Sequence, residues 1–545
     1  MNRVIVRWAL VLVAAAGLAA CGGGGGGGDN PSGGASRFTL TVNVAGSGSV
    51  TSSPAGISCG TTCSAAFDVD TRVTLTATAS AGHALQAWGG ACASASGNTC
   101  TVAMAQAASV SVTFAALPVS GWSSPAVVLS PGGSGSAKVA IDAAGRALAV
   151  WLTLRTGSLS DEDLMASRYE PGTGWSTPVL LETSPRDVMR VELAMDLASG
   201  RAIVLWTQAS DTSNGAAWAR HFDPGTGWTA VAALSSPTGV VDVPSVGIDA
   251  QGNAVAAWSQ LDAQRFSVWG SRGSAAGAWG TAQLLETMDE LGRVDGNPRI
   301  AVAPQGDAIV VWQASGGSVA NRGTWTNRYS TATGWGSASH LVAVSGGSAP
   351  DIAMDANGNA VMVWGQIEPV SATEMYTLIQ AKRYQAGSWG APLRVARDLG
   401  ANSLLSLPIV KMNAAGAALV AWGQGDLSIR ATIAPPGGAW PASTLVKPVG
   451  GRSVTSLLRA ALDADGHAFL AWAQGNDAGT ADAMLASRSP SGGWVAGVPH
   501  DTISEIAADP FVAMDARGNA LYLWTQYMGS TVGTQVVWRR YVSGR

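Results

Sequence analysis

The chain has 545 residues, too long for one small core, so its length predicts several domains or a repeat array. Charged residues make up only 12% and the formal net charge is −4, which excludes the basic surface that nucleic-acid binding requires. Glycine (69) and tryptophan (22) are abundant, as in proteins built from many short strands joined by tight turns.

The N-terminus reads MNRVIVRWALVLVAAAGLAAC, with Arg3 and Arg7 ahead of an apolar run that ends in small residues. That run is too short to span a bilayer comfortably, so residues 1–20 are predicted to be a secretory signal. The sequence LAAC, ending at Cys21, resembles the lipobox of bacterial lipoproteins. The resemblance implies cleavage before Cys21 and lipidation of that cysteine. An ordinary export signal with a chance cysteine is the alternative.

Residues 21–36 are predicted to be the lipidated cysteine and a flexible tether, because Gly22–Gly28 and the following DNPSGGAS cannot pack. In lipoprotein families an Asp directly after the cysteine favours inner-membrane retention, and Gly22 therefore points to the outer membrane. The expected location is the bacterial cell envelope. The protein would contact the membrane through the lipid anchor only, with periplasmic and surface-facing orientations both open.

A small β module is predicted over residues 37–116, where alternating runs such as FTLTVNVA and RVTLTATAS indicate strands. The four remaining cysteines all lie here, and in an exported protein they are expected to form disulfides. Of the three possible pairings, the local pairs Cys59–Cys63 and Cys92–Cys100 are favoured. A metal site is the alternative, but the nearby His83 fits zinc spacing poorly.

The order of GSGSV, SCGTTC, VTLTA, LQAWGGACASASGNTC and VSVTF resembles the divergent internalin-type B repeats of bacterial surface proteins. Trp88-Gly89-Gly90 occupies the place of that family's aromatic-Gly core motif. The resemblance covers about 80 residues of the chain. It implies a small β-rich spacer or adhesion module with no catalytic residues.

Residues 121–545 repeat one unit with a period of about 53 residues. Each of the eight copies contains G-x-A-x-x-x-W, and the tryptophans that end this motif are Trp151, Trp206, Trp258, Trp312, Trp364, Trp422, Trp472 and Trp524. A second tryptophan series, mostly in G-W or G-x-W, lies between them: Trp122, Trp175, Trp228, Trp279, Trp335, Trp389, Trp440 and Trp494.

Each period contains four short runs rich in Val, Ala and aromatic residues, which predict four strands. The fold class is therefore all-β, with an eight-bladed β-propeller of four-stranded blades after the disulfide-containing module. The first G-W strand, residues 121–130, precedes the first three-strand unit, so it is expected to complete the last blade and close the ring. A β-solenoid is the structural alternative.

The stretch IAMDANGNAVMVW places Asp355, Asn357 and Asn359 on alternate positions, as at the start of a calcium loop. Other copies replace these oxygen-bearing residues with Ala or Arg, whereas Gly358 has an equivalent in every copy. A hairpin turn needs such a glycine together with an Asx acceptor. We therefore interpret the stretch as a turn, and neither a metal nor a cofactor is predicted.

Strand order places these short turns at one end of the sheets, the turn face, and the long variable connections at the other end, the loop face. Long connections include residues 155–163, 286–298 and 367–375. Variable loops on a rigid scaffold commonly carry binding sites, so a site is expected on the loop face. A glutamine that follows the strand tryptophan is predicted to form a polar rim there, and capping of neighbouring backbone is favoured over ligand contact as its role: Gln208, Gln260, Gln366, Gln424, Gln474 and Gln526.

The repeats also resemble, loosely, those of sialidase-like propellers, although the spacing of Asp, Gly and Trp differs. That family's chemistry needs an arginine cluster, a Tyr–Glu pair and an acid Asp, and no such non-repeating set stands out. Acidic residues on the loop face, Asp161, Glu162, Asp163 and Glu368, are interpreted as solvated charges.

The sequence favours a monomeric, non-catalytic binding scaffold for a protein or glycan. A sialidase-like glycan-processing enzyme and a structural surface spacer are the alternatives.

Overall fold

The computed structural model describes most of the chain from residue 36 onward. The described residues are 36–59, 63–80, 83–93, 95, 97–116, 121–123, 127–130, 133–155, 161–209, 215–235, 240–262, 265–286, 294–343, 348–369, 375–399, 404–450, 452–476, 479–501, 506–529 and 533–544. The predicted signal, Cys21 and the tether lie outside them. The chain divides into two compact units, residues 1–117 and 118–545.

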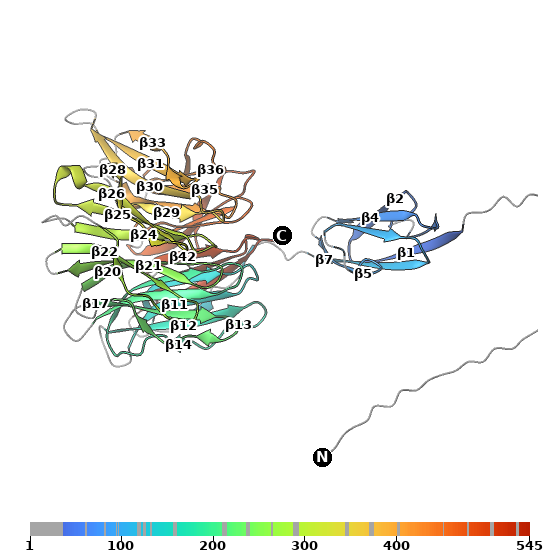
Figure 1. Ribbon diagram of the computed structural model, residues 1–545, viewed down its shortest axis with the longest axis horizontal. Coiled ribbons are helices and arrows are strands. Elements are labelled where there is room, and N and C mark those ends of the chain that lie inside the picture. The colour runs from blue at the N-terminus through green and yellow to red at the C-terminus, as the bar shows by residue number, and fades with distance from the viewer. Residues whose placement is uncertain are drawn as a thin grey trace, which may run out of the picture. The chain divides into compact units, whose positions relative to one another are not determined.

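The described residues of the first unit form seven strands in two sheets, one with the order β3-β1-β7-β5 and the other with the order β2-β4-β6. Figure 1 labels β1, β5 and β7 of the first sheet and β2 and β4 of the second. The strands are β1 (Arg37–Ala45), β2 (Gly48–Ser53), β3 (Ser64–Asp68), β4 (Arg72–Ala79), β5 (His83–Gly90), β6 (Thr99–Ala103) and β7 (Ala108–Ala116). Cys59 is bonded to Cys63 and Cys92 to Cys100, so the predicted local pairing is confirmed.

The core of this unit comes from the alternating residues of its strands. Leu40 and Val42 on β1 and Val110 and Val112 on β7 are buried, as expected when one face of each sheet is covered. Trp88 is buried as well, and its indole Nε1 donates to the Gly97 carbonyl at 3.0 Å. This hydrogen bond ties the Trp-Gly-Gly strand to the loop closed by the second disulfide.

The described strands of the second unit form eight of the ten sheets in the described chain, numbered here 1 to 8 in chain order. The first strands of these sheets are β10 (Gly133–Ile141), β15 (Val188–Met195), β20 (Val240–Ile248), β24 (Val294–Val302), β29 (Asp351–Met354), β34 (Leu404–Met412), β38 (Arg459–Leu462) and β42 (Ala507–Met514). The second strands are β11 (Ala147–Leu154), β16 (Ala202–Ala209), β21 (Ala254–Asp262), β25 (Ala308–Ser315), β30 (Ala360–Pro369), β35 (Ala418–Gln424), β39 (Ala468–Gly475) and β43 (Ala520–Tyr527).

The third strands pair with the second strands in antiparallel fashion. They are β12 (Glu162–Glu170), β17 (Gly215–Asp223), β22 (Arg265–Gly273), β26 (Gly323–Ser330), β31 (Met375–Gln385), β36 (Ile429–Ala434), β40 (Ala481–Arg488) and β44 (Thr534–Val542). The outer strands are short and often split: β13 (Gly174–Trp175), β14 (Val179–Leu180), β18 (Gly227–Trp228), β19 (Ala232–Ala233), β23 (Gln283–Leu284), β27 (Gly334–Trp335), β28 (Ser339–Ala343), β32 (Ser388–Trp389), β33 (Leu393–Leu399), β37 (Thr444–Lys447) and β41 (Trp494–Pro499).

Sheet 8 takes its outer strands from the start of the unit. The strands β8 (Gly121–Trp122) and β9 (Val127–Ser130) both pair with β44, with Trp122 opposite Tyr541. The first strand of every sheet also contacts the first strand of the next, and β42 of sheet 8 contacts β10 of sheet 1. The first strands therefore form an unbroken cycle of contacts, with the N-terminal segment in the last sheet.

The second strand of each sheet is buried on both faces. In β16 and β35 almost every residue is inaccessible to solvent, which explains why both parities of these strands are apolar. The eight tryptophans of the G-x-A-x-x-x-W motif are all among the largest fully buried side chains. The apolar repeat in the sequence thus corresponds to the layer in which neighbouring sheets pack against each other.

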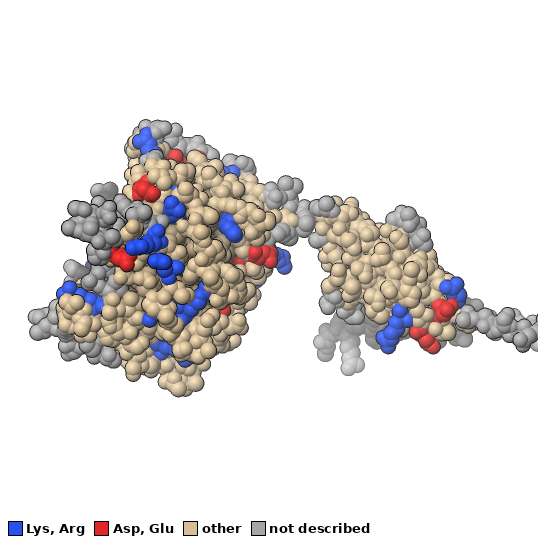
Figure 2. Space-filling view, turned by 90° about the horizontal axis from the view of Figure 1, so that it is seen from above, with Lys and Arg blue, Asp and Glu red and all other residues tan. Residues whose placement is uncertain are grey.

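The prediction of an all-β chain is confirmed, since the described residues contain strands and one short 3-10 turn, η1 (Val319–Asn321). Within the part of the chain that the structure describes, there is no helix with the length and apolar character of a membrane span. The surface visible in Figure 2 is mostly uncharged, with single Lys, Arg, Asp and Glu side chains spread over it.

Candidate functional site

The Asp turn of sheet 5 uses its carboxylate internally. Asp355 is buried, and its Oδ1 accepts the backbone N–H groups of Asn357 and Asn359, both at 2.9 Å. Its Oδ2 accepts the Asn359 side-chain amide at 2.9 Å. Gly358 has φ +82°, which a side chain would strain. The geometry is that of an Asx turn, in which the carboxylate satisfies the donors of its own loop.

The copy in sheet 7 carries a set of metal-ligating residue types that the sequence did not single out as a site. Asp463, Asp465 and His467 offer ligand atoms within 4.8 Å of one another. However, Asp463 Oδ1 accepts the backbone N–H groups of the other two residues, and Asp463 Oδ2 lies 3.1 Å from His467 Nδ1. The cluster is thus the same turn with a histidine in place of asparagine.

The glutamines predicted to form a polar rim are held by the protein itself. Four are buried, and Gln366 and Gln474 are half-buried. In four copies the side-chain Oε1 accepts the indole N–H of the tryptophan two residues earlier, at 3.0–3.3 Å; the glutamines are Gln208, Gln260, Gln474 and Gln526. Gln208 also donates to the carbonyls of Ser184 and Arg186.

Three of the four acidic residues predicted on the loop face approach an arginine. Asp163 pairs with Arg155 at 2.6 Å and Asp161 lies 3.8 Å from the same guanidinium, whereas Glu368 pairs with Arg397 at 2.9 Å on sheet 5. Glu162 donates its backbone N–H to Asp187, so it is held on sheets 1 and 2. Much of the loop face, including residues 156–160, 287–293 and 370–374, lies outside the described residues.

The arginine that ends the third strand packs against the next sheet. Arg168 lies over Phe222, Arg272 over Tyr329 and Arg328 over Tyr384, with the guanidinium carbon 5.3–5.9 Å from the ring centroid. Each such contact joins two consecutive sheets near the turn face and stabilises their packing. The repeated arginines therefore serve mainly to hold neighbouring sheets together.

Sheet 5 departs from its siblings in one hairpin. In sheet 1, Glu170 pairs with Gly174 across a three-residue loop. In sheet 5, Gln385 pairs with Ser388, so the loop is only Ala386-Gly387, and both residues have positive φ as in a type I′ turn. The hairpin between β31 and β32 is one residue shorter, and two cavities flank it.

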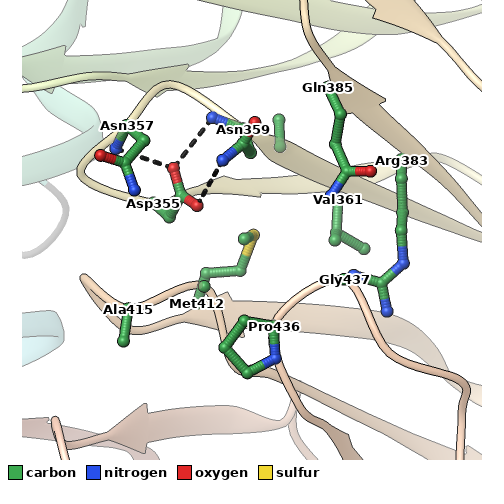
Figure 3. A pocket seen from close by; sticks show the side chains of 12 residues that line it. Asp355, Asn357, Asn359, Val361, Arg383, Gln385, Met412, Ala415, Pro436 and Gly437 are labelled. Carbon is green, nitrogen blue, oxygen red and sulfur yellow. Dashed lines mark hydrogen bonds between the residues drawn. The ribbon is translucent and has the colours of Figure 1, made fainter.

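The larger cavity, of about 280 Å³, lies between sheets 5 and 6 at the turn face. Figure 3 shows Asp355, Asn357 and Asn359 on one side of it and Met412 and Pro436 on the other. Arg383 and Gln385, from the end of β31, complete the lining. The wall thus combines carboxamides, one carboxylate, one cation and apolar side chains that include Met412 and Pro436.

Several polar groups of this cavity have no protein partner among the described residues. The carboxamides of the exposed Asn357 and Gln385 make no side-chain hydrogen bond, and the Asn359 Oδ1 accepts none. In sheet 8 the equivalent oxygen, Asn519 Oδ1, accepts the backbone N–H of Ser543 at 3.1 Å. The short hairpin of sheet 5 gives no such donor, so donors and acceptors remain available for a ligand.

Arg383 is the buried cation of the same cavity, with 8% of its surface exposed. Its Nη2 donates to the Gly438 carbonyl at 2.7 Å and its guanidinium lies 5.4 Å from the Trp440 ring, but its buried Nε has no acceptor. Desolvation lowers the pKa of Arg383, which remains charged at physiological pH.

The second cavity, of about 260 Å³, lies on the other side of the short hairpin, between sheets 4 and 5. Asn357 and Asn359 line both cavities. Here, however, the arginine of sheet 4, Arg328, forms an ion pair with Asp307, and Asp307 also accepts the N–H of Thr331. The polar groups of this cavity are therefore largely satisfied by each other.

A separate group of charges converges from the first strands of the sheets. Lys138 and Glu192 form an ion pair at 2.9 Å, and burial lowers the pKa of Lys138. The charges that act on the pKa of Arg459, besides its burial, come from four other sheets: Glu192, Asp509, Arg299 and Asp351. Arg459 and Lys138 also both approach Phe511, at 5.6 and 5.8 Å from its ring centroid.

Sequence reasoning placed the Asp turn correctly but did not identify the cavity beside it. The missed signal is the hairpin YQAGSW, whose siblings, such as YEPGTGW in sheet 1, contain one more residue. That difference can be read from the sequence, but it gains meaning only when the neighbouring sheets are in place. The first-strand charges were missed because they occupy positions that repeat in structure and not in residue type.

Comparisons with known proteins add a family for one segment and no function for the rest. Residues 38–118 match the divergent InlB B-repeat domain family, as expected from the sequence. No curated protein matches the chain.

Among solved structures, the chain is similar to the BP39L lectin from Burkholderia pseudomallei, at 11% identity and TM-score 0.45 over 67% of this chain and 99% of the lectin. It is also similar to a PL25 ulvan lyase, at 12% identity and TM-score 0.42 over 64% and 93% of the two chains. A third is a puromycin-hydrolyzing peptidase of Mycobacterium tuberculosis, at 14% identity and TM-score 0.39 over 65% and 53%. At these TM-scores the similarities support no assignment of function.

Proposed function

We propose that residues 121–545 form an eight-bladed β-propeller that acts as a non-catalytic scaffold for binding glycans. The observation that carries the proposal is the cavity between sheets 5 and 6. It presents the carboxamides of Asn357 and Gln385, which have no protein partner among the described residues, and the guanidinium of Arg383, whose Nε has no acceptor, beside the apolar Met412 and Pro436. Sugars present many hydroxyl groups that carboxamides can both donate to and accept from, and apolar patches between them.

The propeller assignment is supported by the cycle of contacts between first strands and by the pairing of β8 and β9 with β44. In a propeller the blades surround one axis and leave only short edges exposed, which suits the two-residue outer strands seen here. An experimental structure with eight sheets around one axis would support the assignment, and stacked rungs or fewer sheets would contradict it.

The scaffold is proposed to be a monomeric lipoprotein of the bacterial outer membrane, attached through Cys21 and the glycine-rich tether. This proposal rests on the apolar signal and the LAAC motif. Cys21→Ala should release the protein from the membrane fraction, because a lipid chain would be the only anchor. Continued membrane association of that variant would contradict a lipid anchor at Cys21.

Binding can be tested with the full mature chain on a glycan array, followed by calorimetric titration of the glycans that bind. We expect the double variant Asn357→Ala/Gln385→Ala to lower the affinity for glycan at least 10-fold. Each substitution removes one or more hydrogen bonds between neutral groups, which contribute about 0.5–1.5 kcal/mol each. Arg517→Ala is the matched control, because Arg517 occupies the position of Asn357 in sheet 8. A complete lack of glycan binding would instead favour a structural spacer.

A glycan-processing enzyme is the second candidate, and the first-strand charges favour it. Glu192, Asp351 and Arg459 occupy the same position of different sheets, and sheets 3, 6 and 8 have an uncharged residue at that position. The charges are therefore not a constant part of the repeat, a property that catalytic groups of a propeller enzyme would share. Pairs of carboxylates are the usual catalytic groups of glycoside hydrolysis. Release of reducing sugar from bound glycans, abolished in Glu192→Gln or Asp351→Asn, would establish catalysis and contradict the non-catalytic proposal.

A further inference from the structure

We propose that the cavity between sheets 5 and 6 selects a sugar carrying a carboxylate, a hexuronic acid, through the guanidinium of Arg383. This inference rests on the proposed glycan-binding function and specifies the ligand class of the same site. It starts from a difference between Arg383 and the equivalent arginines of sheets 1, 3 and 4.

The equivalent arginines of sheets 1, 3 and 4 have acidic partners, whereas Arg540 of sheet 8 is half-buried and forms no ion pair among the described residues. Arg272 lies 3.3 Å from Asp249 and also donates to the Tyr329 hydroxyl at 3.1 Å. Arg168 pairs with Glu170 at 2.5 Å, and Arg328 pairs with Asp307. Each of these cations is thus compensated within the protein.

Arg383 has no carboxylate within ion-pair distance among the described residues. Its one hydrogen bond, to Gly438, uses a single donor of the five that a guanidinium carries. In sheet 5 the residue at the position of Glu170 is the neutral Gln385. The substitution removes the negative charge that would otherwise lie next to the arginine.

A buried cation without a counter-charge destabilises the fold, because the protein interior solvates a charge less well than water does. Arg383 is the most buried of the third-strand arginines and cannot release its proton. An anion in the adjacent cavity would offset this cost. A planar carboxylate matches the planar donors of a guanidinium better than a spherical ion does.

The other walls restrict the ligand further. The volume of about 280 Å³ is at the lower limit for ligand pockets, so one sugar ring fits better than a large ligand. Asp355 lines the same cavity, and its negative charge disfavours a ligand with two or more charges. The free carboxamides of Asn357 and Gln385 remain for the ring hydroxyls. A singly charged acidic sugar would provide partners for Arg383 and for both carboxamides, with less repulsion from Asp355 than a ligand of higher charge.

The test is calorimetric titration of the full mature chain with matched pairs of monosaccharides: glucuronate against glucose, and galacturonate against galactose. We expect at least one acid to bind about 10-fold to 100-fold more tightly than its neutral partner, the range given by one charge-assisted hydrogen bond. In Arg383→Gln the ratio of the affinity for the acid to that for its neutral partner should fall below about 3-fold, because the charge that the carboxylate would pair with is lost.

Two further variants keep the test decisive if Arg383→Gln is poorly folded. Gln385→Glu restores an acidic neighbour at an exposed position, as in sheet 1, and should lower the ratio of the affinity for the acid to that for its neutral partner. Arg272→Gln removes an arginine with an internal partner and should leave binding unchanged.

The outcomes separate this inference from the function on which it rests. Equal binding of acidic and neutral sugars, or a preference that survives both Arg383→Gln and Gln385→Glu, would overturn the role of Arg383 but leave glycan binding intact. Binding of no sugar of either pair, with no glycan bound on the array, would overturn both.

Discussion

The guanidinium of Arg540, on the last strand of the chain, lies 5.8 Å from the ring centroid of Tyr169 in sheet 1. It is the same contact that joins sheets 1 and 2 through Arg168 and Phe222. The last and first sheets are therefore joined in the same way as consecutive sheets. The N-terminal strand β8, paired with β44 beside Arg540, completes this junction.

Removing the aromatic residue of β8 should weaken the junction. Trp122 packs against Phe469, Tyr522 and Tyr541, with ring centroids 5.2–6.2 Å apart. Trp122→Ala is expected to lower the free energy of unfolding by about 3 kcal/mol, because a large cavity would form between sheets 7 and 8. Urea denaturation would measure it. Val495→Ala, at an exposed position of β41, is the control and should have little effect.

The tryptophan–glutamine hydrogen bond should contribute to stability wherever the glutamine is buried. Gln208→Ala would leave the Trp206 indole N–H and the carbonyls of Ser184 and Arg186 without their partner. We expect a loss of about 1–3 kcal/mol, the cost of unsatisfied buried polar groups. The same change at the half-buried Gln474 should cost less. A negligible effect of Gln208→Ala in chemical denaturation would contradict this role.

The architecture could be predicted from the sequence because it depends on repetition. Gly358 and Trp364 each have an equivalent in all copies. Comparing the eight copies therefore separates the residues that the fold requires from those that vary between copies. The indole–carboxamide bond could also have been predicted, since residues two apart on a strand point to the same face of the sheet. The cavity could not, because it depends on one missing residue in one hairpin and on how closely two sheets approach there.

Glu182 should contribute to the change of the free energy of unfolding with pH. Burial is the main cause that raises the pKa of Glu182 from 4.5 to about 7, and its backbone partner is the N–H of Leu164. Between these pH values the folded protein keeps a proton that the unfolded chain has released. The contribution of Glu182 is therefore complete below pH 4.5 and is lost as the pH rises through 7.

Glu182→Gln isolates this effect from the opposite one of the buried histidines. Burial lowers the pKa of His221 and of His500 from 6.5 to about 4, so their contribution is lost as the pH falls below 6.5. These contributions are common to both proteins. We expect the melting temperature of the variant, relative to the wild type, to increase from pH 5 to pH 8. A difference that does not change with pH would contradict a raised pKa of Glu182.

The disulfides should stabilise the first unit locally. The bond between Cys92 and Cys100 closes a loop of 8 residues, and such a cross-link is expected to contribute about 2–3 kcal/mol by restricting the unfolded chain. In the double variant Cys92→Ser/Cys100→Ser, amide hydrogen exchange should accelerate within residues 37–116. Exchange in residues 121–545 should remain unchanged. Peptide mapping without reduction would check the pairing independently, and any Cys59–Cys92 or Cys59–Cys100 peptide would contradict it.

Lengthening the short hairpin of sheet 5 should abolish ligand binding without unfolding the protein. Replacing Gln385–Ser388 with the five residues Glu170–Gly174 of sheet 1 would restore the three-residue loop and add a carboxylate next to Arg383. The siblings show that this loop fits between neighbouring sheets, so the melting temperature should change by no more than a few degrees. Glycan affinity should fall at least 10-fold, because the added residue occupies the space between the two cavities and the new charge pairs with the arginine.

The reciprocal exchange, with Gln385–Ser388 placed in sheet 1, is the matched control and should leave binding unaltered. If the lengthened variant still binds as tightly as the wild type, the ligand contacts another part of the protein.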